Sequence, residues 1–336
     1  MQIKPSMQYD HALGALRGLS LGDALGMPTQ SMSAESIRRA YGTVTGLVDA
    51  VDDEPIAPGM PAGSVTDDTE QALLVAAQIC GNGGHIDPHA LASALLSWED
   101  DMKARGSLDL LGPSTKLALE QVRNGADIAT TGRTGTTNGA AMRVTPVGIA
   151  HSTQTPDFAD YVYESCRVTH NTVPGYQSAY LVAAAVSCAI DGASTRDCIT
   201  QAIDLAGAMR WKGAWSPKAS VLARVRLGVD VCVATDDDAR FIRRLRDEFG
   251  TSVESNESVA VAFALAYRYF DRPLKALLTA VNIGGDTDTM AAMSGAILGA
   301  SVGADAFPRA LTGKVAEVSR LELEPVAESL LAVRTR

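Results

Sequence analysis

Residues 282–289 read NIGGDTDT and run directly into the apolar stretch MAAMSGAILGA at residues 290–300. A second segment, GSVTDDTEQ at residues 63–71, has the same character and is followed by the apolar run ALLVAAQI. Each segment predicts a loop that ends in a helix, because Thr and Asp oxygens accept hydrogen bonds from the first free amides of a helix. More than two hundred residues separate the two segments, so a site built from both favours one cooperative domain over residues 1–336.

The rest of the chain has a helical pattern. Hydrophobic residues make up 46% and charged residues 20%, as in soluble globular proteins. Apolar residues recur at i, i+3, i+4 and i+7, which predicts an all-α fold, a single compact multi-helix domain. The segment VRLGVDVCV at 225–233 alternates with period two, and we expect a loop or helix edge there because a lone strand has no partner. Helices are expected near residues 8–26, 67–81, 88–104, 114–124, 138–150, 157–169, 175–191, 197–208, 236–247, 256–270, 273–281, 287–302 and 315–333.

Composition excludes several classes of partner. A net charge of −10 has the wrong sign for binding a nucleic acid duplex or an anionic membrane surface. The longest apolar run, at residues 179–190, is too short to span a bilayer and predicts a buried helix. The N-terminus lacks the apolar region of a signal peptide, and five cysteines without a C-x-x-C pair indicate reduced thiols. We expect a cytoplasmic protein of open oligomeric state, with a monomer slightly favoured.

The density of acids in the two segments exceeds what helix capping needs. Residues 66–69 and 286–289 each place two carboxylates and two hydroxyls within four residues, whereas a cap uses one or two such side chains. Four carboxylates brought together repel, and each costs several kcal/mol to desolvate unless it is protonated or bound to a cation. Oxygen ligands without Cys or His favour Mg²⁺ or Mn²⁺. Capping alone remains the alternative to a site with two ions about 3.5–4 Å apart.

Five motifs in order resemble the ADP-ribosylglycohydrolase family, which includes dinitrogenase reductase-activating glycohydrolase and the ADP-ribosylhydrolases. They are GLSLGDALG (18–26), TDDT (66–69), NGAAMR (138–143), Thr169-His170 and GGDTDT (284–289). The resemblance covers nearly the whole chain and implies a compact all-α domain with a binuclear Mg²⁺ or Mn²⁺ centre in a cleft. The implied metal ligands are Thr66, Asp67, Asp68, Asp286, Asp288 and Thr289.

The resemblance also implies an activity, the hydrolysis of a glycosidic bond at the anomeric carbon of ADP-ribose. Such a reaction needs an oriented sugar, a nearby carboxylate and an activated water. Asp67 or Asp68 is the implied general base, and the loop at 134–139 is implied to hold the diphosphate. The remaining expected ligand-binding residues are Asp23, Gln30, Thr136, Thr137, Asn138, Gly139 and His170. Asp23 lies in an apolar helix, so we expect it to support the site by bonding backbone or a hydroxyl.

The chain departs from the family pattern at two places. Gln30 stands where many relatives carry a Glu, and Gln cannot take a proton or bring charge. Glu35 could substitute if its loop folds back. Asp109 is one residue out of register with the arginine-specific relatives, although Gly112 and Thr115 align. Both departures lower the expectation of ADP-ribosylarginine hydrolysis, and they leave two alternatives open: a nucleosidase-like hydrolase of a small N-glycoside, and a non-catalytic ADP-ribose reader.

Three further side chains have both a structural and a functional interpretation. Arg143 either faces a ligand or pairs with an acidic neighbour, and we favour the structural pairing. Trp211 and Trp215 lie in the loop-like segment MRWKGAWSPK, where they could stack on an adenine. Tryptophans in a helical protein with few aromatics more often belong to the core.

Overall fold

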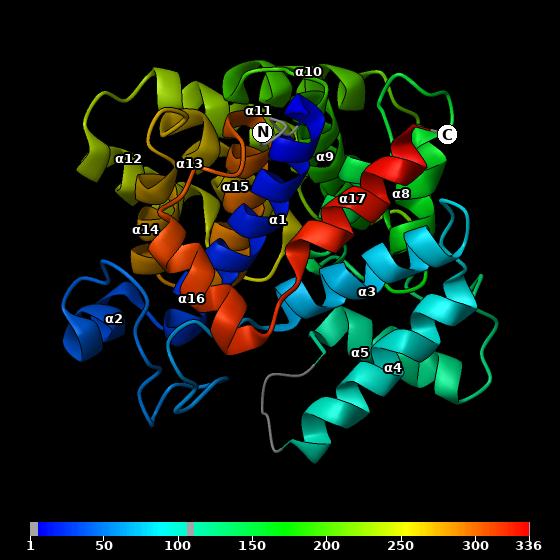
Figure 1. Ribbon diagram of the computed structural model, residues 1–336, viewed down its shortest axis with the longest axis horizontal. Helices are drawn as coiled ribbons and strands as arrows, with labels where there is room; N and C mark the ends of the chain where they lie inside the picture. The colour runs from blue at the N-terminus through cyan, green and yellow to red at the C-terminus, as the bar shows by residue number, and fades with distance from the viewer. Residues whose placement is uncertain (1–5, 106–110, 336) are drawn as a thin grey trace, which may run out of the picture.

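The computed structural model describes residues 6–105 and 111–335, and within these ranges every regular element is helical (Figure 1). β-pairing in the described ranges is limited to three isolated bridges between loops. The expected all-α class is therefore confirmed. The helices are α1 (Met7–Gly26), α2 (Ala34–Tyr41), α3 (Asp67–Gly81), α4 (Pro88–Ala104), α5 (Pro113–Arg123), α6 (Gly139–Met142), α7 (Thr145–Ala150), α8 (Phe158–Cys166), α9 (Val173–Ile190), α10 (Thr195–Gly207), α11 (Val221–Val233), α12 (Asp238–Arg244), α13 (Ser255–Arg268), α14 (Pro273–Ile283), α15 (Thr287–Val302), α16 (Arg309–Ser319) and α17 (Leu323–Arg334), with short turns at Met27–Thr29 and Leu245–Phe249.

Helices α1 and α15 form the centre of the molecule and touch backbone to backbone. A Cβ atom added at Gly18 would lie 2.0 Å from the carbonyl oxygen of Gly295, and one added at Gly22 would lie 2.2 Å from that of Ala291. Numbers rise along one helix as they fall along the other, so the pair is antiparallel. The end of α1 therefore meets the start of α15, where a Cβ at Gly26 would lie 2.3 Å from the Cα of Asp288.

Helix α9 lies against α15 inside the molecule. All its residues from 174 to 190 are buried. By length and composition, Val173–Ile190 is the one helix in the described ranges that could cross a membrane, but 94% of it is buried by the rest of the protein. It is a core helix, as the apolar run predicted. None of the five cysteines forms a disulfide, and four of them are buried.

The structure corrects the sequence-based elements at four places. The helix expected at 138–150 is broken between α6 and α7, because Pro146 lacks an amide for the preceding turn. The helix expected at 315–333 is two helices, separated at Arg320, whose φ of 54° is left-handed. The segment 225–233 is not a loop but the body of α11. Helix α2 was not anticipated because it buries only Ile37.

The error at α11 has a simple cause. Its buried residues include Val225, Gly228 and Val231, which are spaced by three and so share one face of a helix. Exposed apolar residues of the same helix, such as Leu227 and Val233, produced the apparent period of two.

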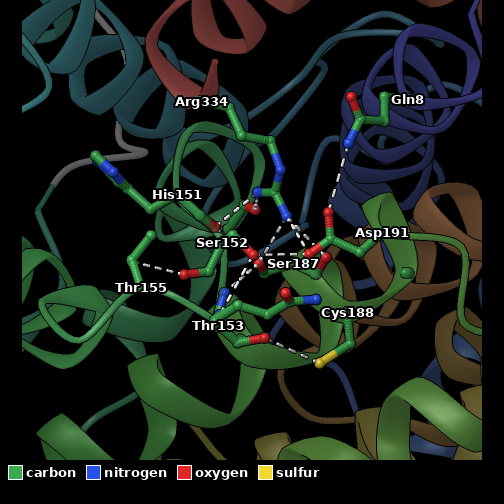
Figure 2. A network of polar contacts seen from close by, with 12 residues as sticks. Gln8, His151, Ser152, Thr153, Thr155, Ser187, Cys188, Asp191 and Arg334 are labelled. Carbon is green, nitrogen blue, oxygen red and sulfur yellow. Dashed lines mark hydrogen bonds and ion pairs between the residues drawn. The ribbon is translucent and has the colours of Figure 1, made fainter. Parts of the chain in front are cut away.

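Arg334 fastens the C-terminal helix to the core (Figure 2). Its side chain is 3% exposed and lies 2.7 Å from Oδ2 of Asp191. The guanidinium also donates to the carbonyl oxygens of Gly148, Ile149 and His151, at and just beyond the end of α7. These carbonyls have no partner within the helix, so one arginine satisfies three acceptors and a carboxylate.

The contact between α1 and α15 predicts an unequal response to Gly→Ala substitution. Gly18→Ala should lower the free energy of unfolding by about 1–3 kcal/mol, because its methyl group would force the two backbones apart. Gly313→Ala is the matched control, since Gly313 lies in α16 and nothing stands within 4 Å of an added Cβ. The free energy of unfolding of the Gly313→Ala control should rise by about 0.5–1 kcal/mol, because Ala has the higher helix propensity. Chemical denaturation measures both, and equal effects at the two sites would contradict the close contact.

The Arg334 network predicts a large loss on removal of its charge. Arg334→Met should lower the free energy of unfolding by about 3 kcal/mol, because Asp191 and the carbonyls at the end of α7 would lose their buried partner. Arg334→Lys should recover only part of this, since an ammonium cannot span the same acceptors. Arg243→Met, at an exposed position of α12, is the control. Thermal unfolding of the three variants tests this, and a Met variant as stable as the control would refute it.

Candidate active site

Asp23 joins the end of α1 to the start of α3. Its carboxylate is fully buried and accepts hydrogen bonds from the backbone amides of Thr66 and Thr69, at 3.0 and 3.1 Å. It also accepts from both threonine hydroxyls, at 2.7 and 2.5 Å. Burial raises the pKa of Asp23 to about 6, against the lowering effect of these hydrogen bonds. Asp23 thus bonds backbone and hydroxyls as expected, and it fixes the first acidic segment from behind.

Two glycines in the left-handed region bring the second acidic segment to the same place. Gly284 and Gly285 both have φ of 88°. A Cβ at Gly285 would lie 2.1 Å from the carbonyl oxygen of Thr251, so only glycine fits there. The Gly285 carbonyl accepts from the Ser31 amide at 2.8 Å, and the Asp286 amide donates to Thr251 at 2.7 Å. This turn therefore positions Asp286 beside residues 30–32.

The two acidic segments meet. The Thr289 hydroxyl donates to Oδ2 of Asp68 at 3.2 Å, which links residues 221 positions apart. Burial first, and then repulsion from Asp288 and Asp67, raises the pKa of Asp68 well above its usual range. Burial and the charge of Asp286 do the same to Asp288. Burial also raises the pKa of Asp286 to about 6. The convergence predicted from the sequence is present.

A cavity of about 250 Å³ opens at this junction. Of the expected site residues, those that line it are Gln30, Asp67, Thr137, Asn138, Gly139, Asp286, Asp288 and Thr289. The other expected residues, which lie outside the lining, are Asp23, Thr66, Asp68, Thr136 and His170. Asp67 is partly exposed whereas Asp68 is fully buried, so of the two candidate bases Asp67 is the one that a water in the cavity can reach.

The loop at 134–139 forms one wall of the cavity. The side-chain amide of Asn138 donates to Oδ2 of Asp286 at 2.5 Å and to the Ser258 hydroxyl at 2.8 Å. Thr136 faces away and donates to Glu254 at 3.0 Å. The backbone amide of Asn138 is already bound to the Val253 carbonyl at 2.9 Å. Asn138 therefore ties the loop to the acidic cluster through its side chain, and its backbone amide is occupied within the protein.

His170 lies behind this wall rather than in the cavity. Its Nε2 is 2.9 Å from the Thr137 hydroxyl and its Nδ1 is 2.8 Å from the Thr169 hydroxyl. Burial and the nearby charge of Arg143 hold the pKa of His170 well below its usual range, so the ring is neutral. Its contact with the site is indirect, through Thr137.

Arg143 has the structural role that we favoured, but its hydrogen-bond partners are neutral. The fully buried guanidinium donates to Gln71 at 3.1 Å and to Thr169 at 2.6 Å. Burial lowers its pKa to about 10. Gln71 in turn donates to Oδ2 of Asp67 at 3.1 Å. Arg143 therefore orients Asp67 through Gln71 instead of pairing with a carboxylate directly.

The departures from the family pattern have distinct outcomes. Gln30 is 6% exposed and lines the cavity, and its Nε2 has no hydrogen-bond partner. Glu35 does not substitute for it, because Glu35 is exposed on α2 and pairs with Arg39 at 3.2 Å. Gly112 and Thr115 both line the cavity, while Asp109 lies outside the described residues.

Neither tryptophan of the loop at 209–218 lines the cavity. Trp211 packs edge-on against Tyr176 and Tyr180, with ring centroids 5.3 and 5.5 Å away, and so belongs to an aromatic cluster. Trp215 is 79% exposed.

Sequence reasoning missed the apolar part of the lining. An apolar side chain carries no chemical signature that would mark it as part of a site, so these positions were not predicted to line the cavity. They are Ile56, Leu111, Pro113, Met142 and Val253.

The donor set fits a hard divalent cation. Asp68 and Asp288 each bury an Oδ1 atom that has no hydrogen-bond partner. Buried carboxylate oxygens without partners, next to like charges, are stabilised by a cation and destabilised without one. Among the described residues, no three His, Cys, Asp or Glu side chains already form a closed metal cage. The carboxylates thus lie at or just behind the surface of one cavity. Their side chains would have to move closer together to coordinate an ion.

Comparison with known proteins places the chain in a family. The profile of the ADP-ribosylglycohydrolases matches residues 4–336. YegU of Escherichia coli K12 is 31% identical over 98% of both chains. ADP-ribosyl-[dinitrogen reductase] glycohydrolase of Rhodospirillum rubrum is 24% identical over 97% of both.

A further relative and a solved structure agree with this assignment. ADP-ribosylhydrolase ARH3 of Mus musculus is 27% identical over 88% of this chain and 84% of its own. A solved structure, of an ADP-ribosylglycohydrolase-related protein complex, has the same fold, with a TM-score of 0.71 and 24% identity over 98% of this chain and 99% of that one. With the convergent acidic segments, these matches show that the chain belongs to the ADP-ribosylglycohydrolase family, a family of glycosidic-bond hydrolases.

Proposed function

We propose that the protein is a hydrolase dependent on two Mg²⁺ or Mn²⁺ ions, and that it cleaves a glycosidic bond at the anomeric carbon of ADP-ribose. The observation that carries this proposal is the meeting of Asp68 and Asp288, each with a buried oxygen that lacks a partner. Family membership supports the reaction class, and the acidic cluster supports the metal dependence.

The ligands of the proposed ions come from both segments. They are Thr66, Asp67, Asp68, Asp286, Asp288 and Thr289. Thr66 gives its proton to Asp23 at 2.7 Å, so a lone pair of its oxygen is left for an ion. Bound ions would supply Lewis-acid stabilisation and lower the pKa of a water. Asp23 and Arg143 support the ligands from behind and would not touch the substrate.

The proposed reaction gives roles to residues that line the cavity. Asp67, held by Gln71, would take the proton of the attacking water as general base. The loop at 134–139 would border the diphosphate, with Thr137, Asn138 and Gly139 at the cavity surface. Gln30 offers an unpartnered N–H donor, which suits a sugar hydroxyl or ring oxygen. Because a side-chain amide neither gives up nor takes up a proton near neutral pH, Gln30 would bind the substrate without acting as an acid or base.

Removal of divalent ions should abolish turnover. We expect the protein to release ADP-ribose from at least one of ADP-ribosylarginine, ADP-ribosylserine and O-acetyl-ADP-ribose with Mg²⁺ or Mn²⁺ present. Activity should fall to background in EDTA and return when either ion is restored in excess. Turnover of nucleosides only would indicate the nucleosidase alternative. Metal-dependent binding of ADP-ribose without turnover would indicate a reader.

Asp68→Asn should stabilise the metal-free protein and remove its response to metal. The substitution deletes one of the repelling buried carboxylates, whose pKa is raised by burial and by the neighbouring acids. We expect the unfolding free energy in EDTA to rise by about 1 kcal/mol or more, with activity lost. The thermal shift produced by Mn²⁺ should shrink, because the variant binds the ion more weakly.

Asp204→Asn, at an exposed position of α10, is the control and should leave activity and the metal-induced shift unchanged. A less stable Asp68→Asn protein that keeps its full response to Mn²⁺ would show that Asp68 is a structural residue.

A further inference from the structure

A second cavity, of about 470 Å³, lies beside the proposed active site. The two cavities share one lining residue, Ile56. Ser64, Val65 and Glu70, which flank Asp67 in sequence, line the second cavity. Its remaining lining residues are Ala57, Pro58, Met60, Met102, Arg105, Val318, Ser319 and Arg320. The loop at 134–139 borders only the first cavity. The two cavities therefore adjoin at Ile56, and the proposed diphosphate wall belongs to the first cavity alone.

Hydrogen bonds hold the walls of this second cavity in place. The Ser319 hydroxyl donates to the Gly63 carbonyl at 3.0 Å and accepts from the Val65 amide at 3.0 Å. The end of α16 is thereby tied to the segment that carries Asp67. On the other side, Glu54 accepts from the backbone amide of Ile56 at 2.7 Å. The wall at Val65 and Ser319 is thus fixed to the acidic segment, and Glu54 holds the turn that carries Ile56.

The charged groups of the second cavity are two arginines and one glutamate. Glu70 accepts a hydrogen bond from the Trp98 ring nitrogen and lies 3.5 Å from Arg105, so its charge is already engaged. The exposed Arg320 makes no ion pair or side-chain hydrogen bond among residues 6–105 and 111–335. The charged lining residues of the cavity therefore sum to one positive charge. Apolar side chains such as Met60 and Met102 also line it.

We propose that this second cavity receives the leaving group of the reaction and favours one that carries carboxylate or phosphate. The inference rests on the proposed function. In that reaction, the bond between the anomeric carbon and the leaving atom breaks, and its electron pair stays with the leaving group. The water oxygen bonds to the carbon and one proton of the water passes to Asp67. Asp67 then gives that proton to the leaving atom, so the acceptor departs protonated and the carboxylate is restored.

Charge decides between acceptor classes. Because Glu70 already pairs with Arg105, the unbalanced charge in this cavity is that of Arg320. A guanidinium or lysine-rich acceptor would bring a like charge beside Arg320, whereas an acidic acceptor would bring an unlike charge. The acidic acceptor therefore gains attraction where the basic one meets repulsion.

Kinetics on matched peptides test the proposal. Peptides would carry ADP-ribose on Ser or on Arg, with flanking residues that are Asp, phosphoserine, Asn or Lys. We expect kcat/KM for the Asp and phosphoserine members to exceed that of the Asn member by about fivefold, and that of the Lys member by more. Whether Asp or phosphoserine ranks higher identifies the anion that the cavity prefers.

Arg320→Glu should invert this order. Arg320 has left-handed φ, so Glu carries the same backbone strain as Arg and the change is one of charge. Binding of free ADP-ribose, measured by calorimetry, should stay within about twofold of wild type, because the second cavity contacts only the leaving group. Arg243→Glu, with the same change of charge on α12, is the control and should keep the wild-type order.

The outcomes separate the two proposals. If the wild-type protein cleaves the peptides with equal kcat/KM, or prefers Lys, the second cavity is not an anion-selective acceptor site although the proposed function stands. The same conclusion follows if Arg320→Glu and Arg243→Glu behave alike. If no peptide is cleaved with Mg²⁺ or Mn²⁺ but O-acetyl-ADP-ribose is, the proposed function stands and this inference is wrong. If neither the peptides nor O-acetyl-ADP-ribose are cleaved, both are wrong.

Discussion

Helix α1 is the element on which both acidic segments depend, because it holds each of them by a contact that tolerates no substitute. Gly26 brings its backbone against Asp288 at the start of α15. Asp23, one turn earlier, accepts hydrogen bonds from four groups at the start of α3, the amides and hydroxyls of Thr66 and Thr69. The glycines allow the approach, and the buried carboxylate fixes the partner. Segments more than two hundred residues apart are thus aligned by the last turn of one helix.

This arrangement stores electrostatic repulsion at the junction. Burial and mutual proximity raise the pKa values of Asp68, Asp286 and Asp288, so the folded protein disfavours their charged forms. Behind them, Arg143 supplies positive charge only through the neutral side chain of Gln71, and His170 stays neutral. The protein itself therefore leaves the cluster uncompensated. Such a site is suited to neutralisation by a bound cation, because no protein side chain neutralises it. The protein is less stable when the cation is absent.

Sequence reasoning recovered what carries a periodic or chemical signature. The helical periodicity predicted the bounds of α1, α3, α9 and α15 to within two residues. The paired acids predicted that the starts of α3 and α15 meet. It failed where backbone conformation decided, as at Arg320, or where exposed apolar residues imitated a strand, as in α11. Spacing also could not show that His170 lies one layer behind Thr137, or that Ile56 separates two cavities, because both facts depend on loop packing rather than on local pattern.

Anomalous X-ray diffraction from crystals soaked in Mn²⁺ tests most directly whether the acids of α3 and α15 share hard divalent ions. We expect two anomalous peaks about 3.5–4 Å apart, in contact with carboxylate oxygens of Asp68 and Asp288, with Asp23 outside the coordination shell. Saturating Mn²⁺ that leaves no peak between the two helices, while those carboxylates keep their present positions, would contradict it.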